Sequence, residues 1–321
     1  MAGKETILVI GCGALAHDVV RALVAQAADR RVVVVQTRPA AGRRAAAVRA
    51  VATAAAAGER SIDPASPACA RELAEVLLEV RPTTLALLAL SQSPVTPAEP
   101  WASDAALADV VVSALDRSIK MGAGAPALLL LSSTAVYGVA VGSPVVFDER
   151  SSLPREAVFA SAHAHWAESL RAVERRLVSW AVTARVRVGV LRTASVLGGP
   201  MDSPIAALLA AALPVRVLGY DPPCQVIHYD DLVEAVALAI DQRCGEVLNI
   251  VGRSVVLLSR LLATAGVFAP PLPGALADSL APAAIDGAHL RWRTLADGRR
   301  ATALLGFRPQ RSLEDCLRAT R

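Results

Sequence analysis

The sequence predicts an α/β fold with a doubly wound parallel sheet and a smaller carboxyl-terminal lobe. Short apolar runs alternate with segments of helical periodicity along most of the chain. A glycine-rich turn separates the first apolar run from the first helical segment. A buried-strand pattern at residues 127–131 ends abruptly in Ser132 and Ser133. In open α/β sheets, ligands bind beyond the carboxyl ends of the strands, so we expect the chemistry at this serine pair.

Length and composition exclude several classes of protein. The chain has 321 residues, 54% of them hydrophobic but only 3% aromatic, and a net charge of +4. Its arginines are dispersed, which argues against a nucleic-acid partner. Five cysteines without a Cys-x-x-Cys pair argue against a metal site or a disulfide framework and favour a reducing cytoplasm. No uncharged apolar stretch is long enough to span a membrane, so we expect no membrane partner either.

The amino-terminal segment resembles a secretory signal only superficially. Glu5 precedes a short apolar run at residues 6–10, and Gly11-x-Gly13-x-x-Ala16 then opens a helix. The first glycine makes a tight turn, the second lets the backbone approach a pyrophosphate, and the alanine allows close helix packing. This context predicts a Rossmann-type dinucleotide site at Gly11, Gly13, Ala14 and Leu15.

The second predicted strand, residues 31–35, bears on which dinucleotide is bound. The acid that usually contacts the adenosine ribose would fall near Gln36, and no acid is present there. Arg38, with Arg43 and Arg44 nearby, could pair with a 2′-phosphate. NADP is therefore favoured over NAD, although these arginines could equally solvate the start of a helix.

The remaining elements follow in βα order. We expect helices up to 57 and at 70–80, 103–121, 157–178, 204–213 and 232–240, and strands at 61–63, 84–90, 127–133, 187–191, 215–218 and 246–251. Residues 269–282 are rich in proline and predict a surface loop or lid. We assign 1–199 to an NAD(P)-binding Rossmann domain to which 226–251 returns, and 200–321 mainly to a smaller substrate-binding lobe.

Several segments together resemble one family. They are Ser132-Ser133-Thr134-Ala135-Val136-Tyr137-Gly138, the segment from Arg192 to Pro200, His228-Tyr229-Asp230-Asp231 and Leu305-Gly306-Phe307-Arg308-Pro309. They are similar to motifs of the extended short-chain dehydrogenase/reductases, the NAD-dependent epimerase/dehydratase group. The resemblance runs from residue 6 to about 317, and the family often forms homodimers. Asp230 and Asp231 also fit a helix N-cap.

The resemblance implies roles for individual residues. Asp63 would accept a hydrogen bond from the adenine amino group, and Leu90 and Ser91 would lie against the cofactor ribose. Thr193 would lie nearest the nicotinamide. Ser133 would orient a substrate carbonyl by hydrogen bonding, or would simply cap the end of its strand.

The tyrosine and lysine that complete the family's catalytic set are missing. The only lysines are Lys4 and Lys120, and neither follows a tyrosine by four residues. One alignment places Phe159 and His163 at the two positions. Matching Glu168 to the family's acidic residue instead places Ala160 and Ala164 there.

Two residues remain as candidate proton donors. His163 is our choice, since an imidazole titrates near neutral pH, and Tyr137 is the reserve. His163 and His165 point about 200° apart on a helix, so only one can face the site. Alternatively, both are partly exposed histidines on a helix, without a catalytic role.

Three functions compete on these observations. The first is an NAD(P)H-dependent oxidoreductase that reduces the carbonyl of a small metabolite. The segment after Pro200 is apolar and poor in charged pairs, which favours an apolar substrate. The second is a non-catalytic NAD(P)-binding sensor or assembly protein. A sugar-nucleotide epimerase or dehydratase ranks lowest, because those enzymes use the missing tyrosine as a base.

Overall fold

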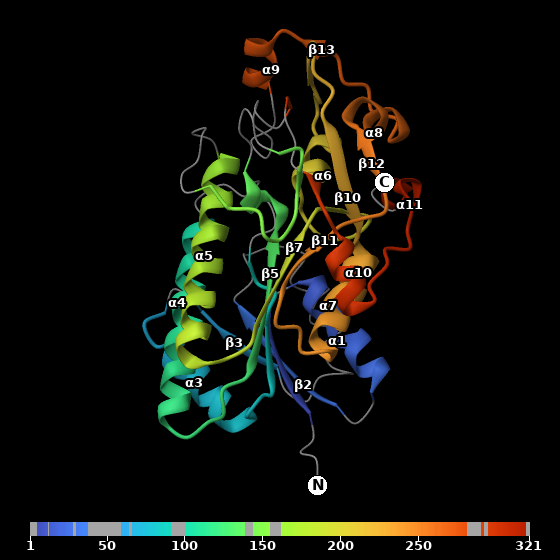
Figure 1. Cartoon of the computed structure of the whole chain (residues 1–321). Coiled ribbons are helices and arrows are strands. Elements are labelled where there is room, and N and C mark those ends of the chain that lie inside the picture. Colours follow the sequence, from blue (N-terminus) through green and yellow to red (C-terminus); the bar gives the residue numbers. More distant parts are fainter. Residues whose placement is uncertain are drawn as a thin grey trace.

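A seven-stranded parallel sheet forms the centre of the protein (Figure 1). The computed structural model describes residues 5–11, 13–27, 30–37, 59–63, 66–90, 100–138, 144–154, 162–280, 290–291 and 295–318. The strand order is β11-β7-β5-β4-β1-β2-β3. The strands are β1 (Thr6–Ile10), β2 (Arg31–Thr37), β3 (Glu59–Ile62), β4 (Thr84–Leu87), β5 (Ala127–Ser133), β7 (Val188–Thr193) and β11 (Val247–Ile250). The predicted Rossmann-type fold is confirmed.

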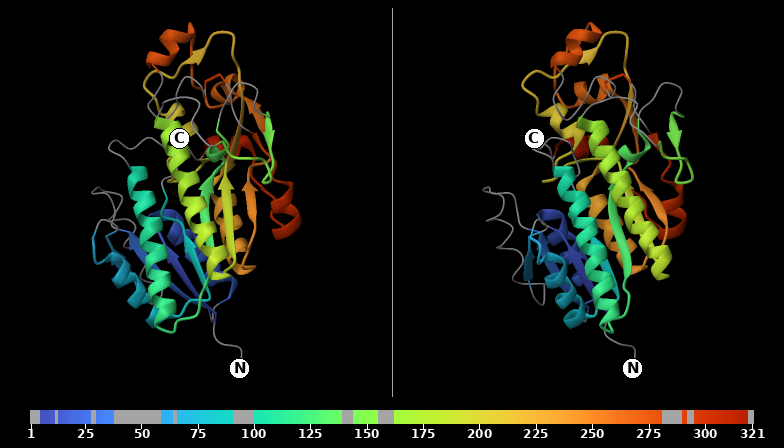
Figure 2. Two further views of the ribbon diagram at one scale, coloured as in Figure 1. Left: turned by 60° about the vertical axis from the view of Figure 1, so that its left-hand side comes forward. Right: turned by 90° about the vertical axis from the view of Figure 1, so that its left-hand side faces the viewer.

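Helices cover both faces of this sheet. On one face α3 (Cys69–Val80), α4 (Pro100–Lys120) and α5 (Ala162–Ala184) pack side by side (Figures 1 and 2). On the other face α1 (Ala14–Gln26) packs against α7 (Tyr229–Asp241), and α10 (Arg299–Leu305) lies beside α7. Because both faces are covered, the strands read as continuous apolar runs rather than as alternating patterns.

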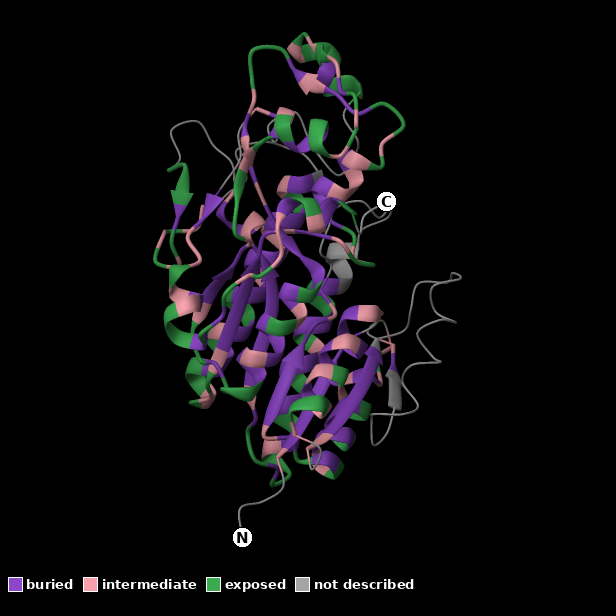
Figure 3. Cartoon of the chain, turned by 90° about the vertical axis from the view of Figure 1, so that its right-hand side faces the viewer, coloured by how far each residue is buried: buried purple, intermediate pink, exposed green. Residues whose placement is uncertain are grey.

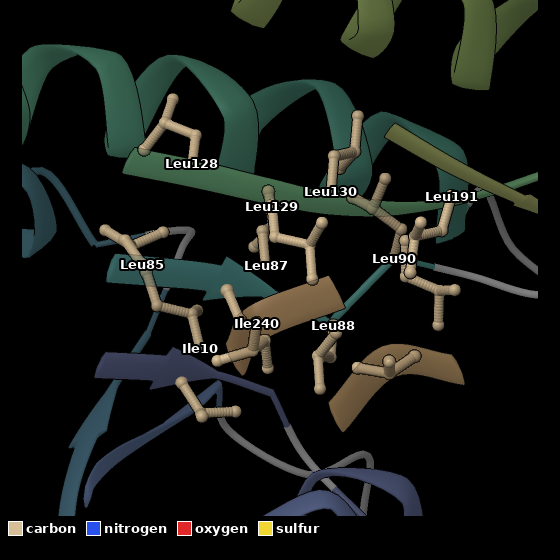
Figure 4. Close-up of a cluster of buried hydrophobic side chains, with 14 of the residues drawn as sticks. Ile10, Leu85, Leu87, Leu88, Leu90, Leu128, Leu129, Leu130, Leu191 and Ile240 are labelled. Atoms are coloured by element: carbon tan, nitrogen blue, oxygen red, sulfur yellow. The ribbon is translucent and has the colours of Figure 1, made fainter. Parts of the chain in front are cut away.

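The core lies between the sheet and these two helix layers. Every residue of β1 and β4 is buried, and the strands are mostly buried in Figure 3. Leucine and isoleucine side chains from β1, β4, β5, β7 and α7 meet in one cluster (Figure 4). Burying each such side chain contributes about 1.5–3 kcal/mol, so this cluster contributes strongly to holding the strands together.

A second, smaller core holds a lobe at the carboxyl end of the sheet, uppermost in Figure 1. It contains a three-stranded sheet, β12-β10-β8, and a two-stranded sheet, β13-β9. The elements are β8 (Ser195–Leu197), β9 (Arg216–Val217), β10 (Pro223–His228), β12 (Val255–Leu257), β13 (Pro271–Leu272), α6 (Pro204–Leu209), α8 (Leu258–Thr264), α9 (Gly274–Leu280) and α11 (Leu313–Arg318). Short strands β6 (Val146–Phe147) and β14 (Leu295–Ala296) pair with each other.

The structure corrects several predicted boundaries. The 269–282 segment is not a plain loop, because it contains β13 and α9. The strand predicted at 84–90 ends at residue 87, and the helix predicted to reach 213 ends at 209. His228, and neither Asp230 nor Asp231, caps α7: its side chain accepts the Asp230 N–H. The helix predicted up to residue 57 lies outside the described residues.

Within the described part of the chain, no helix combines the length and apolar character needed to cross a bilayer.

Candidate functional site

The ends of four neighbouring strands meet at one edge of the large sheet. Leu87 of β4 lies beside Ile10 of β1 and Leu130 of β5. Ser133 and Thr193 are paired at the ends of β5 and β7. The glycine turn, residues 88–90, Ser133 and Thr193 therefore all follow or end strands at the carboxyl edge, where ligands bind in open α/β sheets.

The glycine turn has the conformation that a dinucleotide site needs. Gly13 is the N-cap of α1 with φ 86° and ψ −172°, a conformation that side chains disfavour. A Cβ added there would meet no atom of the described residues within 4 Å, so these residues leave the space beside it open. At Gly11, an added Cβ would lie 3.1 Å from Cβ of Ala16, which explains the small residues in this motif.

The start of α1 is free to receive an anion. No side chain of the described residues caps it, and its first turn carries no acidic residue. The first backbone N–H groups of a helix have no partner within the helix, and the helix dipole favours a negative charge there. The side chain of Leu15 is buried in the core, so any contact from Leu15 to a diphosphate would come from its backbone.

The adenosine end is described only in part. Gln36 is buried at the end of β2, Asp63 follows β3 and is half-buried, and Leu90 is buried. Arg38 and Ser91, which were predicted to contact the cofactor, lie outside the described residues. Their predicted roles stay predictions.

Ser133 makes its hydrogen bonds within the chain. Its hydroxyl accepts from the Ala135 N–H at 3.2 Å, which caps the 3₁₀ helix η1 (Thr134–Tyr137). It donates to the Thr193 carbonyl at 3.4 Å, a long and weak contact. Ser133 therefore acts as a cap, at the point where its strand ends and η1 begins. Because the donated bond is weak, the hydroxyl hydrogen is still available to a stronger acceptor.

A buried polar network lies directly beneath this edge. Arg192 donates to Glu174 on α5 at 2.7 Å, and both side chains are at most 7% exposed. Ser132 donates to the same carboxylate at 2.5 Å. Tyr137 accepts from Arg192 at 3.2 Å and donates to Oδ1 of Asn249 at 2.8 Å. We call these five residues the Glu174 network.

Tyr137, the predicted reserve proton donor, is a buried member of the Glu174 network. The residue is 2% exposed, and its ring stacks on Phe147 with the centroids 5.0 Å apart. Burial raises the pKa of its hydroxyl, although Arg192 and Asn249 work in the opposite direction. After the 3₁₀ turn that follows β5, the hydroxyl donates to Asn249 on β11.

The two candidate histidines of α5 lie in different environments. His163 is 5% exposed and meets Trp166 edge to face, with centroids 5.1 Å apart. His165 is exposed, as expected for residues two apart on a helix. Phe159 and Ala160, which take the position of the family's tyrosine in the two alignments, lie outside the described residues.

No other described tyrosine or lysine restores the missing pair. Tyr229 donates to Asp18 at 2.7 Å, and burial together with this bond raises its pKa. Lys120 is exposed at the end of α4, before β5 begins, and so lies near the amino edge of the sheet. Tyr220 is 42% exposed in the lobe.

Sequence reasoning missed two members of the network. Glu174 stands on the apolar stripe of α5 between Leu170 and Leu177, and an acid on such a stripe signals a buried partner. Asn249 gave no comparable signal, because its partners come from distant parts of the chain.

The segment after Pro200 contains more ion pairs than its sequence suggested. Arg291 pairs with Asp278 at 2.7 Å, and Arg311 pairs with Asp231 at 2.6 Å. The expectation of a segment poor in charged pairs is therefore wrong. Across the described residues, no group of three or more His, Cys, Asp or Glu side chains could hold a metal ion.

Comparisons with known proteins agree with this architecture. A sequence model of the NAD dependent epimerase/dehydratase family matches residues 7–251. Uncharacterized proteins of Mycobacterium tuberculosis and Mycobacterium bovis are 29% identical over 155 residues, which is 46% of this chain and 38% of theirs. The match thus spans less than half the length of these relatives.

Two solved structures illustrate the similarity of fold. UDP-glucose 4-epimerase from Bifidobacterium longum, in complex with NAD+ and UDP, has a TM-score of 0.74 at 16% identity, covering 98% of this chain and 97% of that one. The dTDP-glucose 4,6-dehydratase from Bacillus anthracis, in complex with NAD, has a TM-score of 0.70 at 14% identity, covering 98% and 95%. At these identities the likeness shows the fold alone.

Proposed function

Because the chain belongs to the NAD dependent epimerase/dehydratase family, we propose that it binds a nicotinamide dinucleotide and reduces the carbonyl of a small metabolite. The single observation that carries this proposal is the shared edge. The uncapped start of α1 at Gly13 and the hydroxyl of Ser133 follow strands of one sheet at the same end. A dinucleotide whose diphosphate lies on the α1 N-terminus can then extend its reactive ring toward β5.

The residues present fit such a cofactor. The open space beside Gly13 leaves room for a diphosphate, and the N–H groups around Ala14 supply donors. When bound, the reduced nicotinamide supplies a hydride to the carbonyl carbon. Ser133 donates a hydrogen bond to the carbonyl oxygen in exchange for its weak bond to Thr193, and stabilises the negative charge that develops there.

The alkoxide formed by hydride transfer must take up one proton. His163 is our proposed source, directly or through water, because Tyr137 is held in the Glu174 network. No Tyr-x-x-x-Lys pair can be written anywhere in the sequence. Since the cofactor carries the hydride, loss of that pair lowers the rate without removing the chemistry.

The end of β2 and the segment after Pro200 bear on which cofactor and which substrate are bound. The family is NAD dependent, and we propose that NADP is also accepted, because the acid that would repel a 2′-phosphate is absent at Gln36. We propose an apolar metabolite, because the segment after Pro200 is rich in apolar residues.

A non-catalytic dinucleotide-binding protein is the second candidate. It is favoured by the engagement of the Ser133 hydroxyl in two hydrogen bonds within the chain. Titration of the protein with NADH and NADPH, followed by a panel of ketones, aldehydes, quinones and sugar nucleotides, separates the two candidates. Consumption of the reduced cofactor supports the reductase, whereas tight binding without turnover supports the second candidate.

Variants test the site itself. Ser133→Ala should lower kcat about tenfold to a hundredfold while the Kd of the dinucleotide stays within about twofold, as expected for a group that acts on the developing oxyanion. His163→Asn tests the proton donor, with His165→Asn as the matched exposed control on the same helix. Unchanged turnover in Ser133→Ala would remove that residue from the mechanism.

A further inference from the structure

One buried histidine, His17, contacts the glycine turn at the start of α1. His17 stands on the first turns of α1, four residues after Gly13, and is 7% exposed. Its Nδ1 lies 2.9 Å from the carbonyl oxygen of Gly13. A carbonyl oxygen can only accept, so Nδ1 carries the hydrogen and donates it.

The other ring nitrogen shows that packing alone does not explain this residue. Nε2 of His17 is buried and has no hydrogen-bond partner among the described residues. A buried polar atom without a partner costs free energy, which an apolar side chain of similar size would avoid. The contact with Gly13 is therefore the polar interaction that distinguishes His17 from a leucine or phenylalanine at this position.

The contact acts on the peptide unit that faces the proposed diphosphate. The Gly13 carbonyl and the Ala14 N–H belong to one planar trans peptide, so they point in opposite directions. Holding the carbonyl toward His17, along the helix, directs the Ala14 N–H out of the helix start. Gly13 is the N-cap of α1, so its carbonyl also accepts the first backbone hydrogen bond of the helix, and the side chain of His17 is a second donor to the same oxygen.

We propose that His17 is a positioning residue of the dinucleotide site. Its Nδ1–H adds a second hydrogen bond to the Gly13 carbonyl, and so restrains the Ala14 N–H further in the direction from which it donates to the diphosphate. A preset donor does not have to be ordered when the ligand arrives, which favours binding. This inference rests on the proposed function and adds to it a side chain that tunes affinity without itself touching the ligand.

The test compares variants that keep or remove the donor. His17→Phe keeps a ring but has no N–H, and we expect the Kd values for NADH and NADPH to rise about fivefold to tenfold. His17→Asn retains an amide N–H close to the position of Nδ1, and binding should return to within about twofold of the wild type. His17→Leu serves as the donor-free variant if phenylalanine disturbs folding, and His165→Leu is the exposed control.

Two smaller probes locate the effect. Inorganic pyrophosphate, measured by competition with NADH, should lose affinity in His17→Phe by the same factor, whereas adenosine, which has no diphosphate, should bind all variants alike. A merely structural role would lower the melting temperature and would weaken both probes together, and that result would overturn the inference.

The remaining outcomes separate this inference from the proposed function. Tight dinucleotide binding by the wild type and equally tight binding by His17→Phe and His17→Leu would overturn the role of His17 alone. A wild-type protein that binds neither dinucleotide nor pyrophosphate would overturn the proposed function and the inference with it.

Discussion

Two neighbouring residue pairs at the ends of β5 and β7 lie in opposite environments. Ser132 and Arg192 form one pair, and Ser133 and Thr193 form the next. Because side chains alternate along a strand, the pairs face opposite sides of the sheet. The first pair joins α5 through Glu174, whereas the second makes only weak or local hydrogen bonds at the carboxyl edge.

This difference shows that the strong polar contacts near the site stabilise the fold. The strongest charge-assisted contacts near the site hold the framework, and they include the tyrosine that was a candidate for chemistry. The edge itself is left to a serine, a threonine and backbone groups. The site thus has a strongly hydrogen-bonded network beneath it and few polar side chains at the carboxyl edge. This arrangement fits the proposed reaction, in which a cofactor carries the hydride.

Removing the carboxylate of the Glu174 network is the largest test of this comparison. Glu174→Gln should lower the free energy of unfolding by about 3–5 kcal/mol, because the buried Arg192 cation loses its counter-charge. Urea unfolding measures the change. Glu75→Gln is the matched control on α3, where the carboxylate is exposed and 3.9 Å from Arg71, and it should change stability by less than about 0.5 kcal/mol. Similar losses in both variants would show that the buried network is not special.

Removing the Tyr137 hydroxyl tests whether this residue serves the fold or the reaction. Tyr137→Phe should cost about 2 kcal/mol of stability, because Asn249 and Arg192 each lose a buried partner while the stacking on Phe147 remains. Turnover per folded molecule and the Kd of the dinucleotide should stay within about twofold of the wild type. Thermal unfolding and a cofactor titration measure the two quantities, with Tyr220→Phe in the lobe as control. A tenfold fall in kcat without loss of stability would restore Tyr137 as a proton donor.

The sequence was most informative where local chemistry decides the structure. The turn at Gly11 and Gly13 needs small residues and a positive φ, and the strands are uninterrupted apolar runs, so both were predictable. The direction of the Tyr137 side chain was not, because it depends on a 3₁₀ turn that Ser133 caps. The contacts of Glu174 with Arg192 join segments far apart in the chain and follow only from the packing of α5 on the sheet.

The smallest expected effect is a pH-dependent one on α5. Burial works to raise the pKa of Glu168, but hydrogen bonds from Arg175 and Arg171 outweigh it and lower the pKa below the ordinary value of 4.5. A carboxylate with a lowered pKa stabilises the fold above its unfolded pKa, and this contribution is lost as the pH falls through the folded pKa.

Glu168→Gln should therefore cost about 1 kcal/mol at pH 7, a modest value because the carboxylate side chain is 36% exposed and screened by solvent. The difference from the wild type should shrink as the pH is lowered from 7 toward 3, since the wild-type carboxylate then takes up a proton. Urea unfolding at a series of pH values measures it. A difference that stays constant over this range would mean that Glu168 stabilises α5 through packing and not through its charge. Of the two sets of charges compared, only the buried Glu174 network would then contribute to the free energy of unfolding.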